Sequence, residues 1–142
     1  EKAGLTYKFK SVGNASTRHP NSISLKLTKG DQVVEMEGES RGGGVIRIVS
    51  VNGFDANFTT SSHTLIVEAD DVPGSITFLT SVIAHEDCNI ATMTVSRKGK
   101  HDLACQILEM DSGVKDITLQ YLSSLKWVHK VIYIPDINNL NP

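Results

Sequence analysis

Two short polar turns contain the residues best suited to bind a small molecule. Asp70-Asp71-Val72-Pro73-Gly74 stands before a predicted helix, and Cys88-Asn89 follows it. Asp71 could accept a hydrogen bond from an ammonium group, free N–H groups at the helix start could meet a carboxylate, and Asn89 could bond to either group. The order of elements places both turns at corresponding ends of one small sheet. We therefore expect a site that holds a small amino acid at a subunit interface, without bond-making chemistry.

Other reactive residue types are too scattered to predict catalysis or a metal site. Ser62 and His63 are neighbours in a predicted strand, where adjacent side chains point to opposite faces. Asp70-Asp71 is the notable carboxylate pair, and a helix N-cap explains an aspartate there equally well. Gly42-Gly43-Gly44 lacks the lysine of a P-loop and leads into a strand, which favours a structural role over anion binding. The five histidines lie far apart in the sequence: His19, His63, His85, His101 and His129.

Composition and charge describe a soluble globular protein. The chain has 142 residues, 39% of them hydrophobic and 21% charged, enough for one ordinary domain or two very small ones. The net charge of −2 argues against general nucleic-acid binding, and no apolar stretch approaches the roughly 20 residues that span a bilayer. Cys88 and Cys105 are expected to be reduced thiols, too few for an iron–sulfur cluster. Without an initiator methionine or signal peptide, we expect a fragment of a longer, cytoplasmic protein.

Residues 1–60 predict a β-rich region. Apolar and polar residues alternate over 5–10 and 23–28, the period of half-buried strands. A third strand is expected at 33–37, and a turn at Lys29-Gly30-Asp31 joins it to the second as a hairpin. A fourth apolar run follows the triple glycine at 45–51, and Asn52-Gly53 predicts a tight turn before Phe54. The small polar residues 59–63 are expected to form a linker.

The following residues predict the order β-α-β-β-α-β. We expect strands at 64–68, 90–97, 103–110 and 128–134. The spacing of apolar residues predicts helices over 74–86 and after Asp111-Ser112-Gly113. The predicted fold class is α+β, with a ferredoxin-like sheet whose helices cover one face and leave the other face and an edge free for pairing. The expected domains are residues 1–60 and 61–136, followed by a polar tail at 137–142.

From Thr64 to Ile134 the chain resembles an ACT domain, a small regulatory module of amino-acid metabolism. The resemblance rests on Leu65-Ile66-Val67, Asp71-Val72-Pro73-Gly74, Asn89-Ile90-Ala91 and the final strand. It implies that two ACT domains pair side by side in a homodimer, with L-serine as the expected ligand. An ACT domain that only dimerises is the alternative. The ligand contacts implied by the resemblance are Asp71, Val72, Gly74, Asn89 and Ile90.

Residues before and within this region resemble the β chain of bacterial iron–sulfur L-serine dehydratase. In that family an allosteric-substrate-binding (ASB) domain precedes the ACT domain, so residues 1–60 are expected to be a partial ASB domain. The resemblance implies a chain that is non-catalytic alone and carries no cofactor, with a [4Fe–4S] cluster on a separate α chain that converts L-serine to pyruvate and ammonia. The regulatory end of a D-3-phosphoglycerate dehydrogenase is the runner-up. The matching segments are Glu1 to Phe9, His19-Pro20-Asn21-Ser22, Gly42-Gly43-Gly44, Asn52-Gly53-Phe54 and Ala91 to Lys98.

Overall fold

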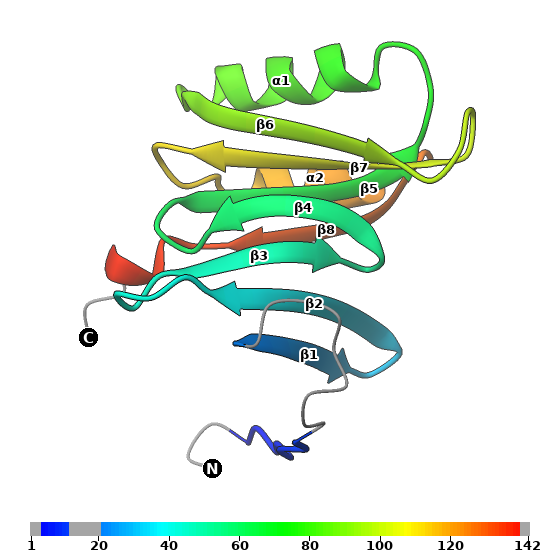
Figure 1. The fold of residues 1–142 in the computed structure, drawn as a ribbon. Coiled ribbons are helices and arrows are strands. Elements are labelled where there is room, and N and C mark those ends of the chain that lie inside the picture. Colours follow the sequence, from blue (N-terminus) through cyan, green and yellow to red (C-terminus); the bar gives the residue numbers. More distant parts are fainter. Residues whose placement is uncertain (1–3, 12–20, 140–142) are drawn as a thin grey trace.

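The computed structural model describes residues 4–11 and 21–139 (Figure 1). Residues 1–3, His19 and Pro20, and the last residues of the expected tail lie outside this part. The elements are β1 (Ser22–Lys29), β2 (Gln32–Ser40), β3 (Ile46–Val51), β4 (Phe54–Thr59), β5 (His63–Asp70), α1 (Ser75–His85), β6 (Ile90–Arg97), β7 (Leu103–Met110), α2 (Asp116–Ser124), β8 (Val128–Ile134) and the 3-10 helix η1 (Ile137–Asn139).

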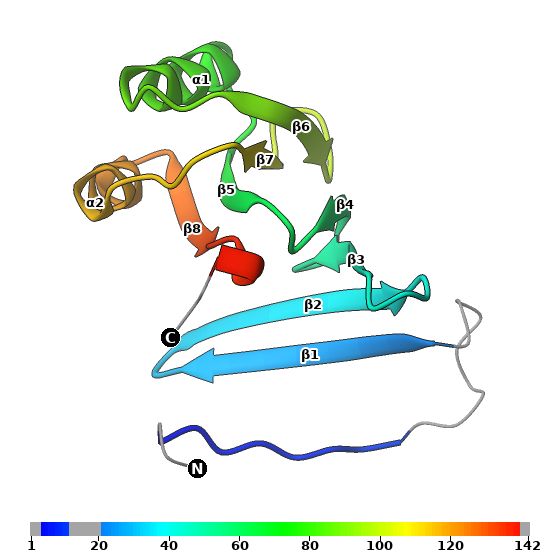
Figure 2. The ribbon, with the colours of Figure 1, turned by 90° about the vertical axis from the view of Figure 1, so that its left-hand side faces the viewer.

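The strands form two antiparallel sheets, which confirms the α+β class. The first sheet has the order β1-β2-β3-β4, so each strand pairs with the next one along the chain. The second sheet has the order β6-β7-β5-β8, which leaves β6 and β8 at its edges. Helices α1 and α2 lie together on one face of the second sheet (Figure 2). The predicted order β-α-β-β-α-β is therefore present from β5 to β8.

The helices bury one apolar side each against the second sheet. Leu79 and Ile83 of α1 are one helical turn apart and almost fully buried, as is Leu122 of α2. They meet Leu65 and Leu108, which point from β5 and β7 to the helix side of the sheet. The apolar spacing thus predicted the buried positions Leu79 and Ile83 correctly, whereas Ile76, also expected on the apolar side, is 46% exposed.

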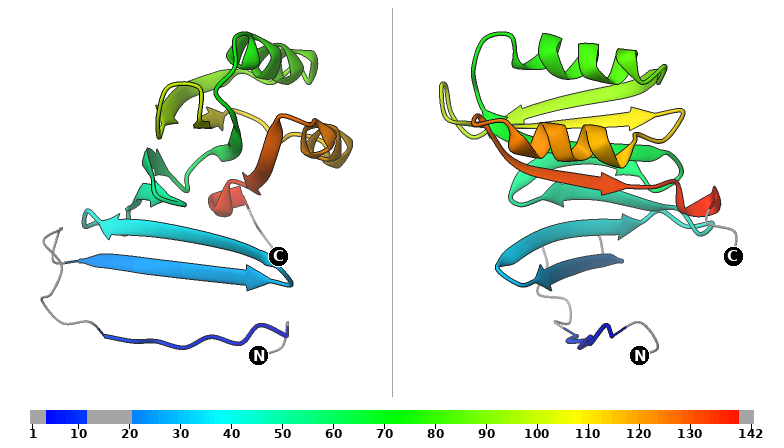
Figure 3. Two further views of the ribbon diagram at one scale, coloured as in Figure 1. Left: turned by 90° about the vertical axis from the view of Figure 1, so that its right-hand side faces the viewer. Right: turned by 180° about the vertical axis from the view of Figure 1, so that it is seen from behind.

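The opposite face of the second sheet is covered by the first sheet, so the expectation of a free face was wrong. Phe54 and Phe58 of β4 pack in one core with Ile66 of β5 and with Cys105 and Ile107 of β7. Figure 3 shows β3 and β4 lying against the second sheet, on the side away from the helices. Because β5 and β7 are buried on both faces, apolar residues such as Leu65 and Ile66 are adjacent in their sequences, without strict alternation.

The strand expected at residues 5–10 is absent, although its alternating pattern is clear. Residues 4–11 run extended beside β1 but form no strand in the structure (Figure 2). Leu5, Tyr7 and Phe9 are 64%, 67% and 87% exposed. Alternation predicts an extended backbone, but a strand also needs a neighbouring strand and a face on which to pack its apolar side chains.

Phe58→Ala tests the core between the sheets. Phe58 is 2% exposed, so its truncation should lower the free energy of unfolding by about 3–5 kcal/mol. Phe9→Ala removes the same atoms from a side chain that is 87% exposed and should change it by less than about 0.5 kcal/mol. Urea unfolding measures both values. Equal effects of the two substitutions would contradict a core shared by the sheets.

Glu86 joins the end of α1 to the start of α2. Its Oε1 accepts a hydrogen bond from Thr118 Oγ1, and its Oε2 lies 3.4 Å from Lys115 Nζ. The Thr118 hydrogen bond, helped by Lys115, lowers the pKa of Glu86 below its ordinary value of 4.5. A carboxylate whose pKa falls on folding stabilises the native state wherever it is ionised in both states.

Glu86→Gln should therefore lower the thermal midpoint at neutral pH. The stabilisation is complete above the unfolded pKa, near 4.5, and is lost as the pH falls through the lower folded pKa. The midpoint difference between wild type and Glu86→Gln should shrink as the pH is lowered from 6 to about 3, as followed by circular dichroism. Asp87→Asn is the matched neighbouring control and should change little at either pH. A difference that is constant over this range would contradict the assignment.

Candidate functional site

The turn from β5 to α1 contains a left-handed glycine, and its aspartates do not cap the helix. Gly74 precedes α1 with a φ of 84°, a left-handed conformation that glycine adopts at little cost. No side chain of the described residues caps α1, so the helix-cap interpretation of Asp70 and Asp71 was wrong. A cavity of about 530 Å³ lies at this turn, lined by residues 71–77 with Arg97, Lys100 and His101.

Asp71 binds the turn between β6 and β7. Its Oδ1 lies 3.5 Å from Arg97 Nη2, and its Oδ2 accepts a hydrogen bond from the His101 backbone N at 3.2 Å. The Asp71 backbone N donates to the Asp102 carbonyl oxygen at 2.9 Å. A ligand ammonium would therefore compete with Arg97 for Asp71. A ligand carboxylate would instead meet Arg97, Lys100 and the uncapped start of α1, which favour negative charge.

Asn89 and Ile90 lie at the other end of α1. Asn89 Nδ2 donates to Asp111 Oδ2 at 2.7 Å, and Ile90 pairs with Met110 of β7. Since α1 has 11 residues, about 16 Å of helix separates this end from the Asp71 turn. Figure 1 shows the end of β5 and the start of β6 at opposite ends of the sheet. The expectation that the two turns lie at corresponding ends was wrong, because α1 carries the chain back along the whole sheet.

Gln106 is a buried polar residue beside the start of α1 that the sequence did not single out. It is fully buried in β7, and its Nε2 donates to Ser75 Oγ in the first turn of α1 at 3.3 Å. Within the described part of the chain its Oε1 has no hydrogen-bond partner. A glutamine inside the apolar run Leu103–Met110 was the available signal.

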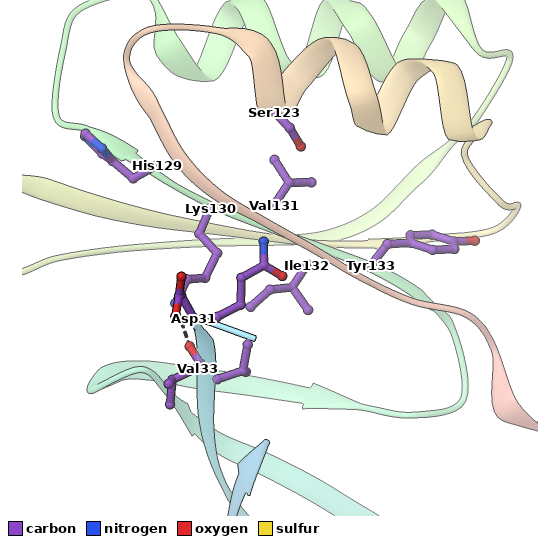
Figure 4. A pocket seen from close by; sticks show the side chains of 10 residues that line it. Asp31, Val33, Ser123, His129, Lys130, Val131, Ile132 and Tyr133 are labelled. Atoms are coloured by element: carbon purple, nitrogen blue, oxygen red, sulfur yellow. Dashed lines mark hydrogen bonds between the residues drawn. The ribbon is translucent and has the colours of Figure 1, made fainter. Parts of the chain in front are cut away.

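The cavity between the β1–β2 turn and β8 is separate from the candidate ligand residues. It has a volume of about 580 Å³ and contains none of the five predicted contacts. Figure 4 shows Lys130 reaching from β8 to Val33, whose carbonyl oxygen accepts its Nζ hydrogen bond at 2.7 Å. His129 Nε2 lies 2.6 Å from Asp70 Oδ1. Both contacts join β8 to neighbouring elements, which is a structural role.

The remaining polar motifs have structural partners. Gly42-Gly43-Gly44 lies in the turn between β2 and β3 with φ values of 84°, 62° and 79°, a left-handed conformation that glycine adopts at little cost. His63 Nδ1 lies 2.7 Å from Tyr133 Oη, and no hydrogen bond joins its ring to the Ser62 side chain among the described contacts. In the described residues no group of three or more His, Cys, Asp and Glu side chains could hold a metal ion.

Both cysteines are free and buried, as expected for reduced thiols. Burial, with a smaller effect of the Glu68 charge, raises the pKa of the Cys105 thiol to about 12. Cys105 therefore stays protonated at neutral pH. A search of the described helices finds none that is long and apolar enough to cross a membrane.

Sequence comparisons relate the chain to two kinds of enzyme. It is 31% identical over 136 residues (96% of this chain) to the probable L-serine dehydratase β chain of Bacillus subtilis, and 26% identical over 117 residues (82%) to the L-serine dehydratase β chain of Peptoniphilus asaccharolyticus. It is also 29% identical over 94% of its length to the D-3-phosphoglycerate dehydrogenase of Bacillus subtilis, of which it covers 24%. No protein-family model matches.

The chain spans 61% and 53% of the two β chains that it matches. The similarity to them extends over both sheets and both helices, since the longer match covers 96% of this chain. The expected resemblance is therefore confirmed: this chain is a relative of the β chain of L-serine dehydratase.

Proposed function

We propose that this chain is a regulatory part of an L-serine dehydratase β chain that dimerises and senses L-serine. The observation that carries the proposal is the similarity over 96% of the chain to a protein named as such a β chain. The chain would be non-catalytic alone. It would modulate an α chain that converts L-serine to pyruvate and ammonia.

We assign residues 61–136 to an ACT domain and residues 1–60 to a partial ASB domain. The order β5-α1-β6-β7-α2-β8 and the sheet order β6-β7-β5-β8 support a ferredoxin-like ACT arrangement. The two parts would act together, because the core between the sheets contains residues of both.

The homodimer would form by antiparallel pairing of two β6 edges. β6 is at the edge of the second sheet and has unpaired backbone groups on its outer side. Antiparallel pairing places the start of one strand beside the end of the other. Asn89 and Ile90 of one copy would then meet the Asp71 turn of the second copy, so the five candidate residues would line one shared site, repeated twice by symmetry.

L-serine would bind this shared site through both of its charged groups. Its carboxylate would meet the uncapped start of α1 and Arg97, and its ammonium would meet Asp71 and the Asn89 amide oxygen. The Asp71 carboxylate would then interact with both the ligand ammonium and Arg97 of its own chain, whose Nη2 lies 3.5 Å from Asp71 Oδ1.

The catalytic [4Fe–4S] cluster would be on the α chain. The β-chain names of the relatives support a second, separate chain. This chain has two cysteines, Cys88 and Cys105, which are too few to hold a [4Fe–4S] cluster through four thiolates.

A regulatory segment of a D-3-phosphoglycerate dehydrogenase is the second candidate. The match to that enzyme covers 94% of this chain and so includes both sheets. The two candidates differ in the catalytic unit that the module accompanies: a separate α chain in the first, and a dehydrogenase domain of the same polypeptide in the second. A module that only dimerises is the third candidate.

Titration of the chain with L-serine by calorimetry tests the sensing role. We expect saturable heat with L-serine, none with D-serine, and no pyruvate produced. Asn89→Ala should weaken binding about tenfold or more, the effect of losing a hydrogen bond to a charged group. Asn57→Ala, which removes an amide on β4 away from the site, should bind like the wild type. Absence of heat with the wild-type chain would leave the dimerisation module as the better description.

Sedimentation of Val95→Asp tests the dimer. Val95 lies on β6 and is 44% exposed, so an aspartate there should prevent pairing of the two edges and give a monomer. Ile23→Asp makes a similar change on β1, the edge strand of the other sheet, where Ile23 is 45% exposed. That control should stay dimeric. A dimer that survives Val95→Asp but not Ile23→Asp would place the interface on the first sheet.

A further inference from the structure

Lys98, at the end of β6, contacts the hairpin between β3 and β4. Its Nζ donates to the Asn52 carbonyl oxygen at 3.4 Å and lies 4.6 Å from the centre of the Phe54 ring. Two residues before Lys98, Ser96 Oγ donates a hydrogen bond to the carbonyl oxygen of Asp55, the residue after Phe54, at 2.9 Å. The end of β6 is therefore attached to the tip of this hairpin, which belongs to the other sheet.

Asn52 connects that tip to two further strands. Its φ of 48° is left-handed, a conformation that asparagine tolerates better than most residues. Its Oδ1 accepts a hydrogen bond from the Glu35 backbone N of β2 at 2.8 Å, and its backbone N donates to the Glu35 carbonyl oxygen at 2.7 Å. Its Nδ2 donates to Glu68 of β5. Asn52 is thus the point where β2, β5 and the Lys98 contact converge.

Glu68 makes the position of Asn52 energetically important. Its side chain is nearly buried, with the residue 9% exposed, and it lies two residues before the end of β5. A buried carboxylate that loses its hydrogen-bond donor pays the cost of desolvation without compensation. A small displacement of the hairpin tip would therefore change the stability of the contact between the sheets.

The turn of residues 98–102 touches the candidate ligand turn on its other side. Asp71 accepts from the His101 backbone N and pairs with Arg97, the neighbour of Lys98. The turn is short and closed by hydrogen bonds from Lys98 N to Leu103 O at 3.1 Å and from Asp102 N to Gly99 O at 3.4 Å. Lys98 and the His101 backbone that Asp71 contacts therefore belong to one hydrogen-bonded turn.

We propose that the β6–β7 turn couples the Asp71 turn to the first sheet through Lys98, Asn52 and Glu68. A ligand that draws Asp71 away from Arg97 and His101 would shift the turn and loosen the Lys98 contact with the hairpin tip. The inference deepens the proposed sensing role, because it gives the route from the ligand site to the first sheet. Its test needs no ligand, so a failure to bind L-serine does not decide it.

Amide hydrogen exchange of the full chain, followed by NMR, tests the coupling. Asp71→Asn weakens the contact with Arg97, and it should speed exchange of the Glu35 and Asn52 amides about threefold or more, as expected for energetically coupled residues. In a Lys98→Met background the same substitution should leave these amides unchanged. In a Lys100→Met background, a matched loss of charge from the same turn, the threefold effect should persist.

Arg97→Met provides a second way to free Asp71 if Asp71→Asn fails to give a native spectrum. The same acceleration at Glu35 and Asn52, dependent on Lys98, is expected. An effect confined to residues 98–102 would overturn the proposal. An effect of equal size in the Lys98→Met background would also overturn it, since the coupling would then bypass Lys98.

Discussion

The burial of β5 and β7 on both faces is the constraint on which the rest of the structure depends. Leu65 and Leu108 face the helices, while Ile66 and Ile107 face β3 and β4. The helices pack on one face of these two strands and the first sheet packs on the other, so β5 and β7 set the positions of both. The positions of β5 and β7 in turn determine where the turns at their ends lie. The Asp71 turn therefore follows directly from a buried strand, although its own residues are half-buried or exposed.

Electrostatics at this turn favour recognition of a carboxylate over recognition of an ammonium group. Asp71 is partly neutralised by Arg97, and Lys100 and the uncapped start of α1 add positive potential around the cavity. The amide of Asn89 is engaged by Asp111 at the distant end of α1. One chain therefore holds two halves of a candidate amino-acid site, which antiparallel pairing of two chains would bring together. Such a design would link ligand binding to dimerisation.

The sequence of this chain matches proteins in which it spans very different shares of the length. It covers 61% of a probable L-serine dehydratase β chain but 24% of a D-3-phosphoglycerate dehydrogenase. This difference in coverage supports the proposal of a regulatory module that accompanies different catalytic units. The contacts of Lys98 and Asn52 lie within that module, so the proposed coupling would operate wherever the module is placed.

Periodicity in the sequence determined the identity of most elements, because hydrophobic spacing depends only on local backbone geometry. The pattern of apolar residues predicted the helices and the strands of the second sheet, and the Asn52-Gly53 dipeptide predicted the turn between β3 and β4. Only the tertiary structure decided which faces are covered, since β3 and β4 reach the second sheet by contacts distant in sequence. It also decided that Asp71 and Asn89 lie at opposite ends of α1, and that Asp71 binds Arg97 and caps no helix. Residue types can indicate what a site could bind, but the distances between them are set by packing.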